Sequence, residues 1–576
     1  MKKIVFYFAL IFFLSSFSGF SQNWGTFGGS SSRNGLSKIT GPQNVTSTFW
    51  NINSSNLTTL GNAVYTFGDK FVTSRVKFSP YTGLIECRDL QNGSLIWETP
   101  FISNTSILYC IGFNEDGVYA HDYDSDTIYA FNVDDGTIKW SSQLTSQTFG
   151  AYPGCVFACN GDLIVNGPGP AGMSTMRLNK YTGDTVWTNA NTFSIGPAVG
   201  LAASETTVYR ITGAVTSPIR LTTIDINTGA TKYFTPHIPG DPDQENPITI
   251  GSGGEIYFWR DGGNLFAYED NGTGLLQTWF YVPQTTTGAA FYGNIAEGVD
   301  GNLYVFDSGK IRRIDYTSGG VLDSSIININ QGSISVGADS TVYVDDQNGM
   351  FYALSYDLQT VKWQLAVGSN YYCNPALAKD GIMIMTGGGY NIKAYKPTLT
   401  LKPVADFRAS ATKVFTNQLV DFFDQSSYSP TSWQWYFPGA NTTTSTQQNP
   451  TGTIYSTPGI YKVTLVADNS NGSDSVTKAC YIEVEVATAI NEFMVYGLQF
   501  TVYPNPADEF VVISSEFADK SRIKIFDVNG KEVFKQELSL LSGSRLRTSD
   551  FPNGIYLLQL ISNENIFMKK IIIQHD

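Results

Sequence analysis

Ile128-Tyr-Ala-Phe-Asn-Val-Asp-Asp-Gly-Thr-Ile-Lys-Trp140 is the stretch that decides the fold of most of this chain. A strand-like segment runs into an Asp/Gly turn, and a second strand-like segment ends on Trp. The same frame returns from Ile85 to Trp97 and from Phe351 to Trp363, and weaker copies end on Trp187, Tyr233 and Trp279. The spacing of about 41 to 47 residues fits four short strands with their turns, which is one propeller blade. The sequence therefore predicts an all-β propeller.

Turn residues recur in register along these repeats. Asn114-Glu-Asp-Gly117, Val299-Asp-Gly-Asn302 and Lys379-Asp-Gly381 each precede an apolar strand. Gly, Asp and Asn supply the positive φ that tight hairpins need, and they interrupt the chain before a helical period can develop. The Trp that ends each repeat is too large to leave in water, so we expect it to pack between neighbouring blades.

The aromatic positions at the ends of the repeats predict the number of blades. They fall at Trp50, Trp97, Trp140, Trp187, Tyr233, Trp279, Val321-Leu322 and Trp363. The last unit, from Gly381 to Tyr395, lacks an aromatic outer strand, and the strand that ends on Trp50 lacks inner strands. Pairing these two parts would close the ring and remove its exposed edges. The prediction is eight blades, with seven as the alternative.

The unit from Tyr129 to Trp140 resembles the repeat of the pyrroloquinoline-quinone-type propellers. The opening from Trp24 to Gly35 resembles the segment that leads into such rings. We place this propeller at residues 22–398. The resemblance implies the fold but does not decide the chemistry, because the same repeat serves quinone-dependent dehydrogenases and proteins that only bind other proteins.

The first residues are typical of a secretory signal peptide. Met1-Lys-Lys3 precedes an apolar run from Ile4 to Phe20, which places the signal at residues 1–21 and cleavage between Ser21 and Gln22. The alternative is a retained membrane anchor, for which the run is barely long enough. No later segment approaches a transmembrane length. Loss of the two lysines changes the formal net charge from −14 to −16, so we expect no nucleic-acid partner.

Six cysteines are too few for a disulfide-dense scaffold. Cys110, Cys155 and Cys373 precede turns at similar positions in different repeats. Cys155 and Cys159 lie about 13 Å apart if their strand is extended, which is too far for a disulfide between them. Two alternatives remain for the set: buried free thiols, or a bridge between adjacent blades.

A different pattern occupies residues 402–486, after Pro397 and Pro403. Alternating aromatic and apolar residues predict strands of a small immunoglobulin-like sandwich, namely Trp433, Trp435 and Phe437 in one strand and Tyr461, Val463 and Leu465 in another. These strands, with Ala405-Asp-Phe407, resemble a PKD-type module, which implies a spacer or a weak binding unit. The chain has Phe437-Pro-Gly-Ala440 where many members have Phe-Gly-Asp-Gly.

The end of the chain carries an ordered set of motifs after a linker at 487–500: Val502-Tyr-Pro-Asn-Pro-Ala507, Ile523 to Lys531, Leu546 to Asp550, Pro552 to Leu558 and Lys569 to Ile573. Residues 501–576 thereby resemble the C-terminal sorting domain of the type IX secretion system of Bacteroidota, with Asn529-Gly530 as a hairpin turn. The resemblance implies export across the outer membrane by the type IX machinery, followed by release or surface attachment. It assigns the sorting signal to Tyr503, Pro504, Asn505, Pro506, Gly554, Tyr556, Lys569 and Lys570.

No catalytic, cofactor-binding or metal-binding residue is predicted. The chain has three histidines, His121, His237 and His575, and lacks the usual hydrolase, zinc, phosphate-loop and haem motifs. It also lacks the adjacent cysteine pair of the quinone dehydrogenases. Asp122-Tyr-Asp-Ser-Asp126 alternates carboxylates as calcium loops do, but Thr127 holds the place of the required Gly, which favours a hairpin turn. Calcium and pyrroloquinoline quinone are the alternatives to having no cofactor.

These patterns favour a secreted or cell-surface binding or scaffold protein without catalytic activity. The propeller would be its interaction platform for an extracellular protein or glycan. The alternative is an extracellular enzyme that uses the propeller funnel, either quinone-dependent or acting on polysaccharide. Carboxylates with shifted pKa values in the funnel would favour the enzyme.

Overall fold

The structure is a computed structural model of the 576-residue chain. It describes residues 23–575 apart from 24, 27–28, 54–56, 60–63, 79–80, 101–107, 123–124, 145–154, 170–171, 190–200, 215–216, 239–247, 260–263, 285–293, 330–331, 347–348, 368–375, 387–390, 487–499, 504, 516–520, 528–530, 539–543 and 563–564. The signal-peptide prediction, Pro504, Cys373 and the Asn529-Gly530 turn lie outside the described residues. The chain divides into two compact units, residues 1–485 and 486–576.

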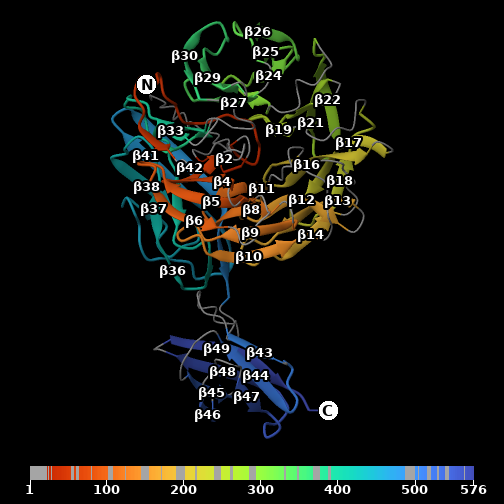
Figure 1. The fold of residues 1–576 in the computed structure, drawn as a ribbon, viewed down its shortest axis with the longest axis vertical. Coiled ribbons are helices and arrows are strands. Elements are labelled where there is room, and N and C mark those ends of the chain that lie inside the picture. The colour runs from red at the N-terminus through yellow and green to blue at the C-terminus, as the bar shows by residue number, and fades with distance from the viewer. Residues whose placement is uncertain are drawn as a thin grey trace, which may run out of the picture. The chain divides into compact units, whose positions relative to one another are not determined.

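Eight antiparallel sheets follow one another within the described part of Trp50–Tyr395, and we number them sheets 1 to 8 (Figure 1). Sheets 1 to 4 consist of β2–β6 (Leu57–Thr59, Tyr65–Phe67, Lys70–Phe78, Tyr81–Asp89, Leu95–Pro100), β7–β10 (Leu108–Asn114, Gly117–Asp122, Thr127–Phe131, Ile138–Gln143), β11–β14 (Cys155–Phe157, Leu163–Gly169, Gly172–Leu178, Thr185–Asn189) and β15–β18 (Leu201–Ala203, Thr207–Ala214, Ser217–Asp225, Thr231–Phe234). Sheets 5 to 7 consist of β19–β22 (Ile248–Ile250, Ile256–Trp259, Leu265–Asp270, Leu275–Tyr281), β23–β26 (Ala296–Glu297, Leu303–Asp307, Lys310–Ile314, Val321–Ser324) and β27–β30 (Gly332–Val336, Val342–Asp346, Met350–Leu354, Val361–Ala366).

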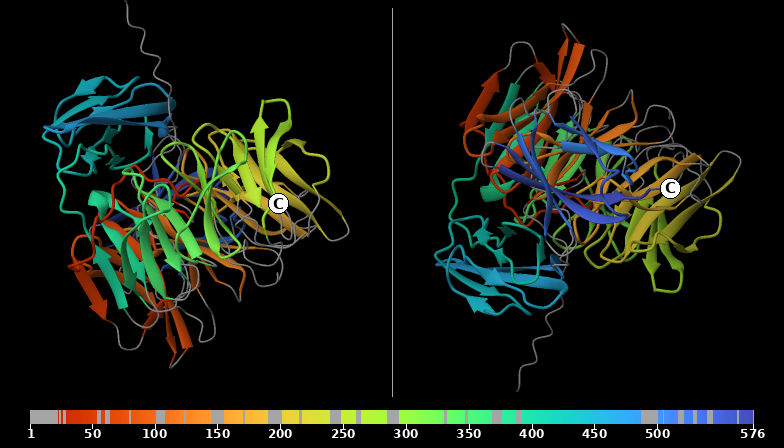
Figure 2. Two further views of the ribbon diagram at one scale, coloured as in Figure 1. Left: turned by 90° about the horizontal axis from the view of Figure 1, so that it is seen from above. Right: turned by 90° about the horizontal axis from the view of Figure 1, so that it is seen from below.

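Sheet 8 combines the two ends of this region. It contains β31 (Ala376–Leu377), β32 (Met383–Thr386) and β33 (Asn391–Tyr395), with a 3₁₀ turn at Lys379–Gly381, and its outer strand is β1 (Trp50–Asn53). Trp50 lies opposite Ala394 in the β1–β33 ladder. The predicted pairing of the first strand with the last unit is therefore confirmed. This closure leaves the sheets arranged as a β-propeller-like ring (Figure 1), and Figure 2 shows teal strands of sheet 8 beside red strands.

Apolar clusters fill the spaces between successive sheets. Each cluster draws its residues from two neighbouring sheets: Cys87 and Phe113 belong to the cluster of sheets 1 and 2, and Ile384 and Phe71 to the cluster of sheets 8 and 1. The inner strands of each sheet are apolar on both faces, because a neighbouring sheet covers each face. Tyr119 and Val118, adjacent in β8, are both fully buried but belong to different clusters.

A Trp of one sheet packs against the next sheet at most junctions. The Trp140 indole Nε1 donates a hydrogen bond to the Lys180 carbonyl of sheet 3 at 2.9 Å. A Cβ at Gly183, whose φ is +74°, would lie 2.4 Å from the same indole. A glycine contacts the Trp of the preceding sheet in this way at five junctions, because a larger residue would collide with the indole; these are Gly93, Gly136, Gly183, Gly229 and Gly319. Equivalent indole bonds start from Trp50, Trp97, Trp187, Trp279 and Trp363.

The junction between sheets 6 and 7 departs from this arrangement. Asp323, not Val321 or Leu322, lies opposite Arg313 at the register position that Trp holds elsewhere. The sequence placement of the aromatic position on Val321-Leu322 was therefore wrong, because both side chains are about half exposed. Arg313 pairs with Asp323 at 2.7 Å and lies over the Tyr356 ring of sheet 7 at 5.1 Å. Tyr304 replaces the indole donor and bonds the Tyr356 carbonyl at 2.7 Å.

The segment before β1 runs along the inner strands of the ring. Carbonyls of Gly25, Ser31, Ser32, Asn34 and Gly35 accept hydrogen bonds from the amides of Phe113, Ala203, Ile250, Glu297 and Val336, near the ends of β7, β15, β19, β23 and β27. These strand ends precede the turns that join the first and second strands, so we call this side of the ring the turn end. The turn end is thus occupied by the protein's own chain.

Nine strands, β34–β42, form the second module of the first unit: Phe407–Ala409, Lys413–Phe415, Leu419–Val420, Phe422–Asp424, Ser432–Tyr436, Thr444–Ser445, Thr453–Ile454, Gly459–Asn469 and Gly472–Glu485. Five of them form one sheet in the order β35-β42-β41-β38-β39. Trp435 and Phe437 are buried in one core with Val463 and Leu465, and Trp433 and Tyr461 pack against it. The two predicted aromatic faces are confirmed.

The second unit, residues 486–576, contains two sheets. One has the order β43-β44-β47 (Phe500–Tyr503, Phe510–Ser515, Ser544–Arg547). The other has the order β46-β45-β48-β49 (Glu532–Leu538, Ser521–Phe526, Gly554–Ser562, Asn565–Ile573). Alternate residues such as Ile523, Leu558 and Ile571 are fully buried in the shared core.

Candidate functional site

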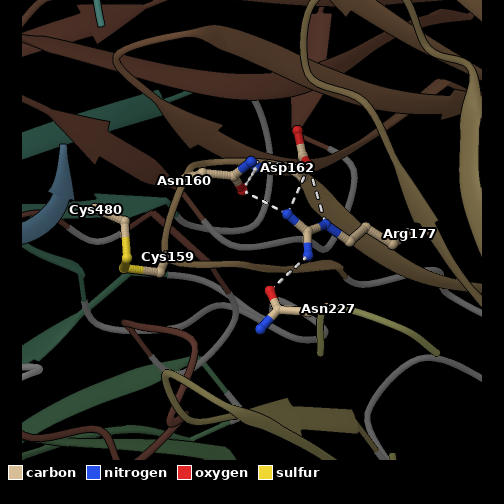
Figure 3. Close-up of a disulfide and its surroundings, with 6 residues drawn as sticks. All are labelled: Cys159, Asn160, Asp162, Arg177, Asn227 and Cys480. Atoms are coloured by element: carbon tan, nitrogen blue, oxygen red, sulfur yellow. Dashed lines mark hydrogen bonds and ion pairs between the residues drawn. A yellow bond between two sulfur atoms is a disulfide. The ribbon is translucent and has the colours of Figure 1, made fainter. Parts of the chain in front are cut away.

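A disulfide joins the ring to the second module (Figure 3). Cys159 follows β11 in the first turn of sheet 3, and Cys480 lies on β42; their Cα atoms are 5.6 Å apart. Neither sequence alternative foresaw this pairing, because partners 321 residues apart meet only through tertiary folding. Among the described cysteines, Cys87, Cys110 and Cys155 are buried free thiols. Burial raises the pKa of Cys87 and of Cys155 to about 12, which leaves both thiols protonated and unreactive.

The turn that carries Cys159 is held rigidly. Arg177 donates from Nε to Asp162 at 2.9 Å and from Nη2 to Asn160 at 3.0 Å, both in this turn. Its Nη1 reaches Asn227 of sheet 4 at 3.4 Å (Figure 3). One arginine therefore fixes the disulfide-bearing turn to two sheets.

A partly buried ammonium group lies at the contact between the ring and the second module. Lys478 of β42 pairs with Asp406 at 3.3 Å and is 21% exposed. Its Nζ lies 4.8, 5.0 and 5.8 Å from the ring centres of Phe407, Tyr481 and Phe67, the last from sheet 1. Burial lowers the pKa of Lys478, but the carboxylates of Asp406, Glu115 and Asp116 together outweigh that effect and the net shift is upward. The charge is thus kept by its neighbours.

Further polar contacts surround this ammonium. Tyr481 donates to Glu115 of sheet 2 at 2.6 Å, and burial raises the pKa of Glu115. Lys180 of sheet 3 bonds Asp116 at 2.8 Å and Thr412 of the second module at 2.9 Å. At sheet 8, the Asp380 carboxylate accepts from the Tyr428 amide at 3.0 Å. Because buried charges cost several kcal/mol when unpaired, these pairs fix one relative placement of ring and module.

Polar residues also gather where the second strands reach the opposite end of the ring. His121 Nε2, in the second strand of sheet 2, lies 3.6 Å from Asp126. Asp122 and Thr127 pair across the β8–β9 hairpin, as the sequence predicted, although residues 123–124 are outside the described part. These groups mostly join strands to one another.

Asp345 in β28 is different from these polar residues. Its side chain is buried, and within the described part of the chain neither carboxyl oxygen has a hydrogen-bond partner. Burial, and then the nearby Asp346 charge, raise the pKa of Asp345 well above 3.8. The carboxyl group is thereby held in its neutral form. A carboxyl group with a raised pKa is what we expected of an enzyme, although this one is buried.

The predicted sorting residues fall into two groups. At one edge of the sorting unit, Asn505 accepts from the Ile572 amide at 2.7 Å and donates to the Lys570 carbonyl at 3.1 Å, next to the cis Asn505–Pro506 bond. Tyr503 lies in β43, and Lys569 and Lys570 lie in β49 opposite Leu558 and Leu557. In the second group, Gly554 begins β48, and the buried Tyr556 donates to the Pro552 carbonyl at 2.9 Å.

Tyr556 also lines a groove of 530 Å³ that the sequence did not indicate. Its walls are β46 and β47, and its other residues come from the turn before β48. The lining comprises Val533, Phe534, Gln536, Arg545, Leu546, Arg547, Asp550, Phe551, Pro552 and Tyr556. His575 bonds the Phe551 carbonyl at 2.8 Å and Asp508 at 3.0 Å, contacts that raise the pKa of His575. In the sequence, the spacing of Arg545 and Arg547 was the one sign of this groove. The sequence did not show which strand lies across the groove from them.

Three family models match separate parts of the chain. The secretion system C-terminal sorting domain matches residues 501–574, and the PKD domain matches residues 400–484. The model described as outer membrane protein assembly factor BamB matches residues 81–249. The chain carries a type IX sorting domain. It is therefore exported to the cell surface or secreted, with a PKD domain and a pyrroloquinoline-quinone-like repeat region as cargo.

One solved structure supports the fold of the ring. Quinohemoprotein alcohol dehydrogenase from Comamonas testosteroni is 12% identical with a TM-score of 0.50, over 68% of this chain and 83% of that chain. BamB from Moraxella catarrhalis is 13% identical with a TM-score of 0.46, over 61% of this chain and 99% of that chain. An endo-acting ulvan lyase of Formosa agariphila is 29% identical over 113 residues, 19% of this chain and 21% of the lyase. The chain thus spans about a fifth of that relative's length.

Two observations apply to the described ranges alone. No helix there has the length and hydropathy of a membrane span. No three His, Cys, Asp or Glu side chains there are grouped to hold a metal ion.

Proposed function

We propose that this protein is an extracellular binding or scaffold protein without catalytic activity, whose eight-bladed propeller is the interaction platform. Signal peptide 1–21, propeller 22–398, immunoglobulin-like module 402–486 and sorting domain 501–576 would be its parts. The sorting signal would comprise the residues named above, from Tyr503 to Lys570. No cofactor is required by this proposal, and the ligand would be an extracellular protein or glycan.

One observation carries the proposal. At the turn end, the inner strands of the ring are bonded to the chain's own Gly25–Ile39 segment, and the second module meets this end at Cys159 and Lys478. A ligand is therefore expected at the opposite end, where the β8–β9 turn lies. The second module then holds the platform rigid instead of acting as a flexible spacer.

The test compares two exposed turns of sheet 2 that lie at opposite ends. Ser125 is in the β8–β9 turn, and Asp135 is in the β9–β10 turn at the turn end. Each is replaced by Cys and coupled to a bulky maleimide polymer, and the full chain is applied to a glycan array and to immobilised ulvan. Coupling at Ser125→Cys should abolish retention of any bound ligand, whereas coupling at Asp135→Cys should not. The reverse pattern would refute the proposal.

A polysaccharide-acting enzyme is the second candidate, favoured by the partial match to an ulvan lyase and by the neutral, buried Asp345. Incubation of the full chain with ulvan tests it, since a lyase leaves unsaturated sugar ends that absorb ultraviolet light. A quinone-dependent enzyme is tested by adding pyrroloquinoline quinone with calcium. A ligand that binds only the folded chain raises its melting temperature, and we expect no such rise.

A further inference from the structure

The groove of the sorting domain lies between two strands that each form the edge of a sheet. β46 is the first strand of one sheet order and β47 is the last strand of the other. In the described part of the unit, neither pairs with a second neighbour. An edge strand offers a row of backbone N–H and C=O groups to an added strand. The opposite side of the unit is closed, because Ala507 bridges to Ile573 beside the Asn505 contacts.

The floor of this groove is apolar and held in place. Phe551 packs edge-on against Phe534 at 6.1 Å and against Tyr556 at 5.6 Å. His575 holds the Phe551 carbonyl, so the end of the chain fixes the floor. An extended segment in the groove would place every second side chain on these rings.

The rim of the groove carries two positive charges, spaced two residues apart like the alternate side chains of an extended segment. Arg545 and Arg547 are exposed, lie two residues apart on β47, and alternate with the buried Leu546. Arg545 lies over the Phe510 ring at 3.3 Å and Arg547 bonds Ser549 at 2.6 Å; within the described residues neither forms an ion pair. Asp550 is the single carboxylate of the lining. Side chains directly opposite in paired strands interact, so two carboxylates two residues apart would complement these arginines.

We propose that this groove binds an extended segment of a partner protein, added as a strand along β47. Its apolar side chains would rest on Phe534, Phe551 and Tyr556. Its intervening carboxylates would pair with Arg545 and Arg547. The partner is a protein that the chain meets during export or processing. The proposal does not depend on what the propeller binds, so the array experiment and this one can fail separately.

The binding test uses a short synthetic peptide of alternating Glu and Val, with a Lys/Val peptide of equal length as its counterpart. Amide hydrogen exchange of the full chain should show protection of the β47 amides by the Glu/Val peptide alone. The double substitution Arg545→Glu and Arg547→Glu should weaken Glu/Val binding by at least about tenfold and favour the Lys/Val peptide. The matched control, Lys531→Glu with Lys535→Glu, makes the same charge change on exposed residues outside the groove and should change the affinity less than twofold.

Three results would overturn the proposal. These are no protection of β47, equal protection by both peptides, and protection of another strand. Concentration-dependent protection of β47 without peptide would identify a second copy of the chain as the occupant, which also contradicts it. Lys/Val binding by the Arg545→Glu, Arg547→Glu variant separates recognition from misfolding, because a misfolded unit would bind neither peptide. The milder Arg545→Gln, Arg547→Gln variant should lose Glu/Val binding without gaining Lys/Val binding.

Export supplies an independent result. In a bacterium with a type IX system, the Arg545→Glu, Arg547→Glu chain should accumulate in the periplasm, while the Lys531→Glu, Lys535→Glu chain should reach the surface or the medium. Export of the double arginine variant at the level of the unaltered chain would refute a role for the groove in export.

Discussion

Neighbouring sheets of the ring meet through an indole ring, a glycine and one hydrogen bond, whereas the ring meets the second module through a disulfide and buried charges. The first contact is neutral and repeats with the sequence, as Trp140 and Gly183 show. The second occurs once and joins Cys159 to Cys480 and Lys478 to Phe67. The ring tolerates a sequence change at one of these repeated junctions, since the other junctions keep the same contact. A unique junction depends on a few groups, and here one of them is a covalent link.

Removal of the disulfide should give the largest effect. The double substitution Cys159→Ser and Cys480→Ser opens a loop of 321 residues, for which chain entropy predicts a loss of about 6 kcal/mol. All ten tryptophans precede residue 486, so tryptophan fluorescence during urea unfolding reports on the first unit alone. We expect a lower midpoint, with exposure of Trp433 and Trp435 before the ring unfolds. An unchanged midpoint would show that the charged contacts suffice.

Trp140→Ala tests the repeated junction. It removes a buried ring and an indole hydrogen bond, and the first unit should lose about 4 kcal/mol. Ile138→Ala, on the same strand but 46% exposed, is the control and should cost less than about 1 kcal/mol. Urea unfolding of the full chain measures both. Equal losses would mean that the Trp does not hold the sheets together.

Lys478→Met separates charge from packing at the unique junction. Methionine keeps the aliphatic stem but leaves the Asp406 carboxylate without its ammonium, at a cost of about 2 kcal/mol. Lys462→Met on the neighbouring strand, where the side chain is exposed, should change the free energy of unfolding little. A gain in stability for Lys478→Met would show that the buried charge serves specificity and not stability.

Asp345→Asn should give the smallest change, and it should stabilise. Because the folded pKa is raised above 3.8, the stability tied to the neutral carboxyl is complete below pH 3.8 and is lost as the pH rises through the folded pKa. The amide removes that loss, so the variant should be more stable than the unaltered chain at pH 8 and differ from it little at pH 4. Thermal unfolding at both pH values measures the difference. An equal gain at both would assign the effect to packing.

Local patterns predicted the parts of the molecule that repeat. The Trp positions foretold the sheet junctions and the pairing of β1 with β33, because the same local frame imposes the same contact each time. The frame failed at sheet 6, where Asp323 with Arg313 replaces Trp. An ion pair has no periodic signature, so apolar Val321-Leu322 looked like the better candidate. The groove on β46 and β47 was missed for a related reason, since edge strands cannot be recognised before the strand order is known.

The sequence by itself determined the strands, the turns, the seats of the tryptophans and the export route, since each depends on residues close together in the chain. Tertiary structure alone decided that Cys159 bonds Cys480, that Lys478 lies among three aromatic rings, and that Asp345 is held neutral. These features depend on contacts between groups far apart in the chain, or on the burial of a carboxyl group away from water. Spacing along a chain records neither proximity across a fold nor burial.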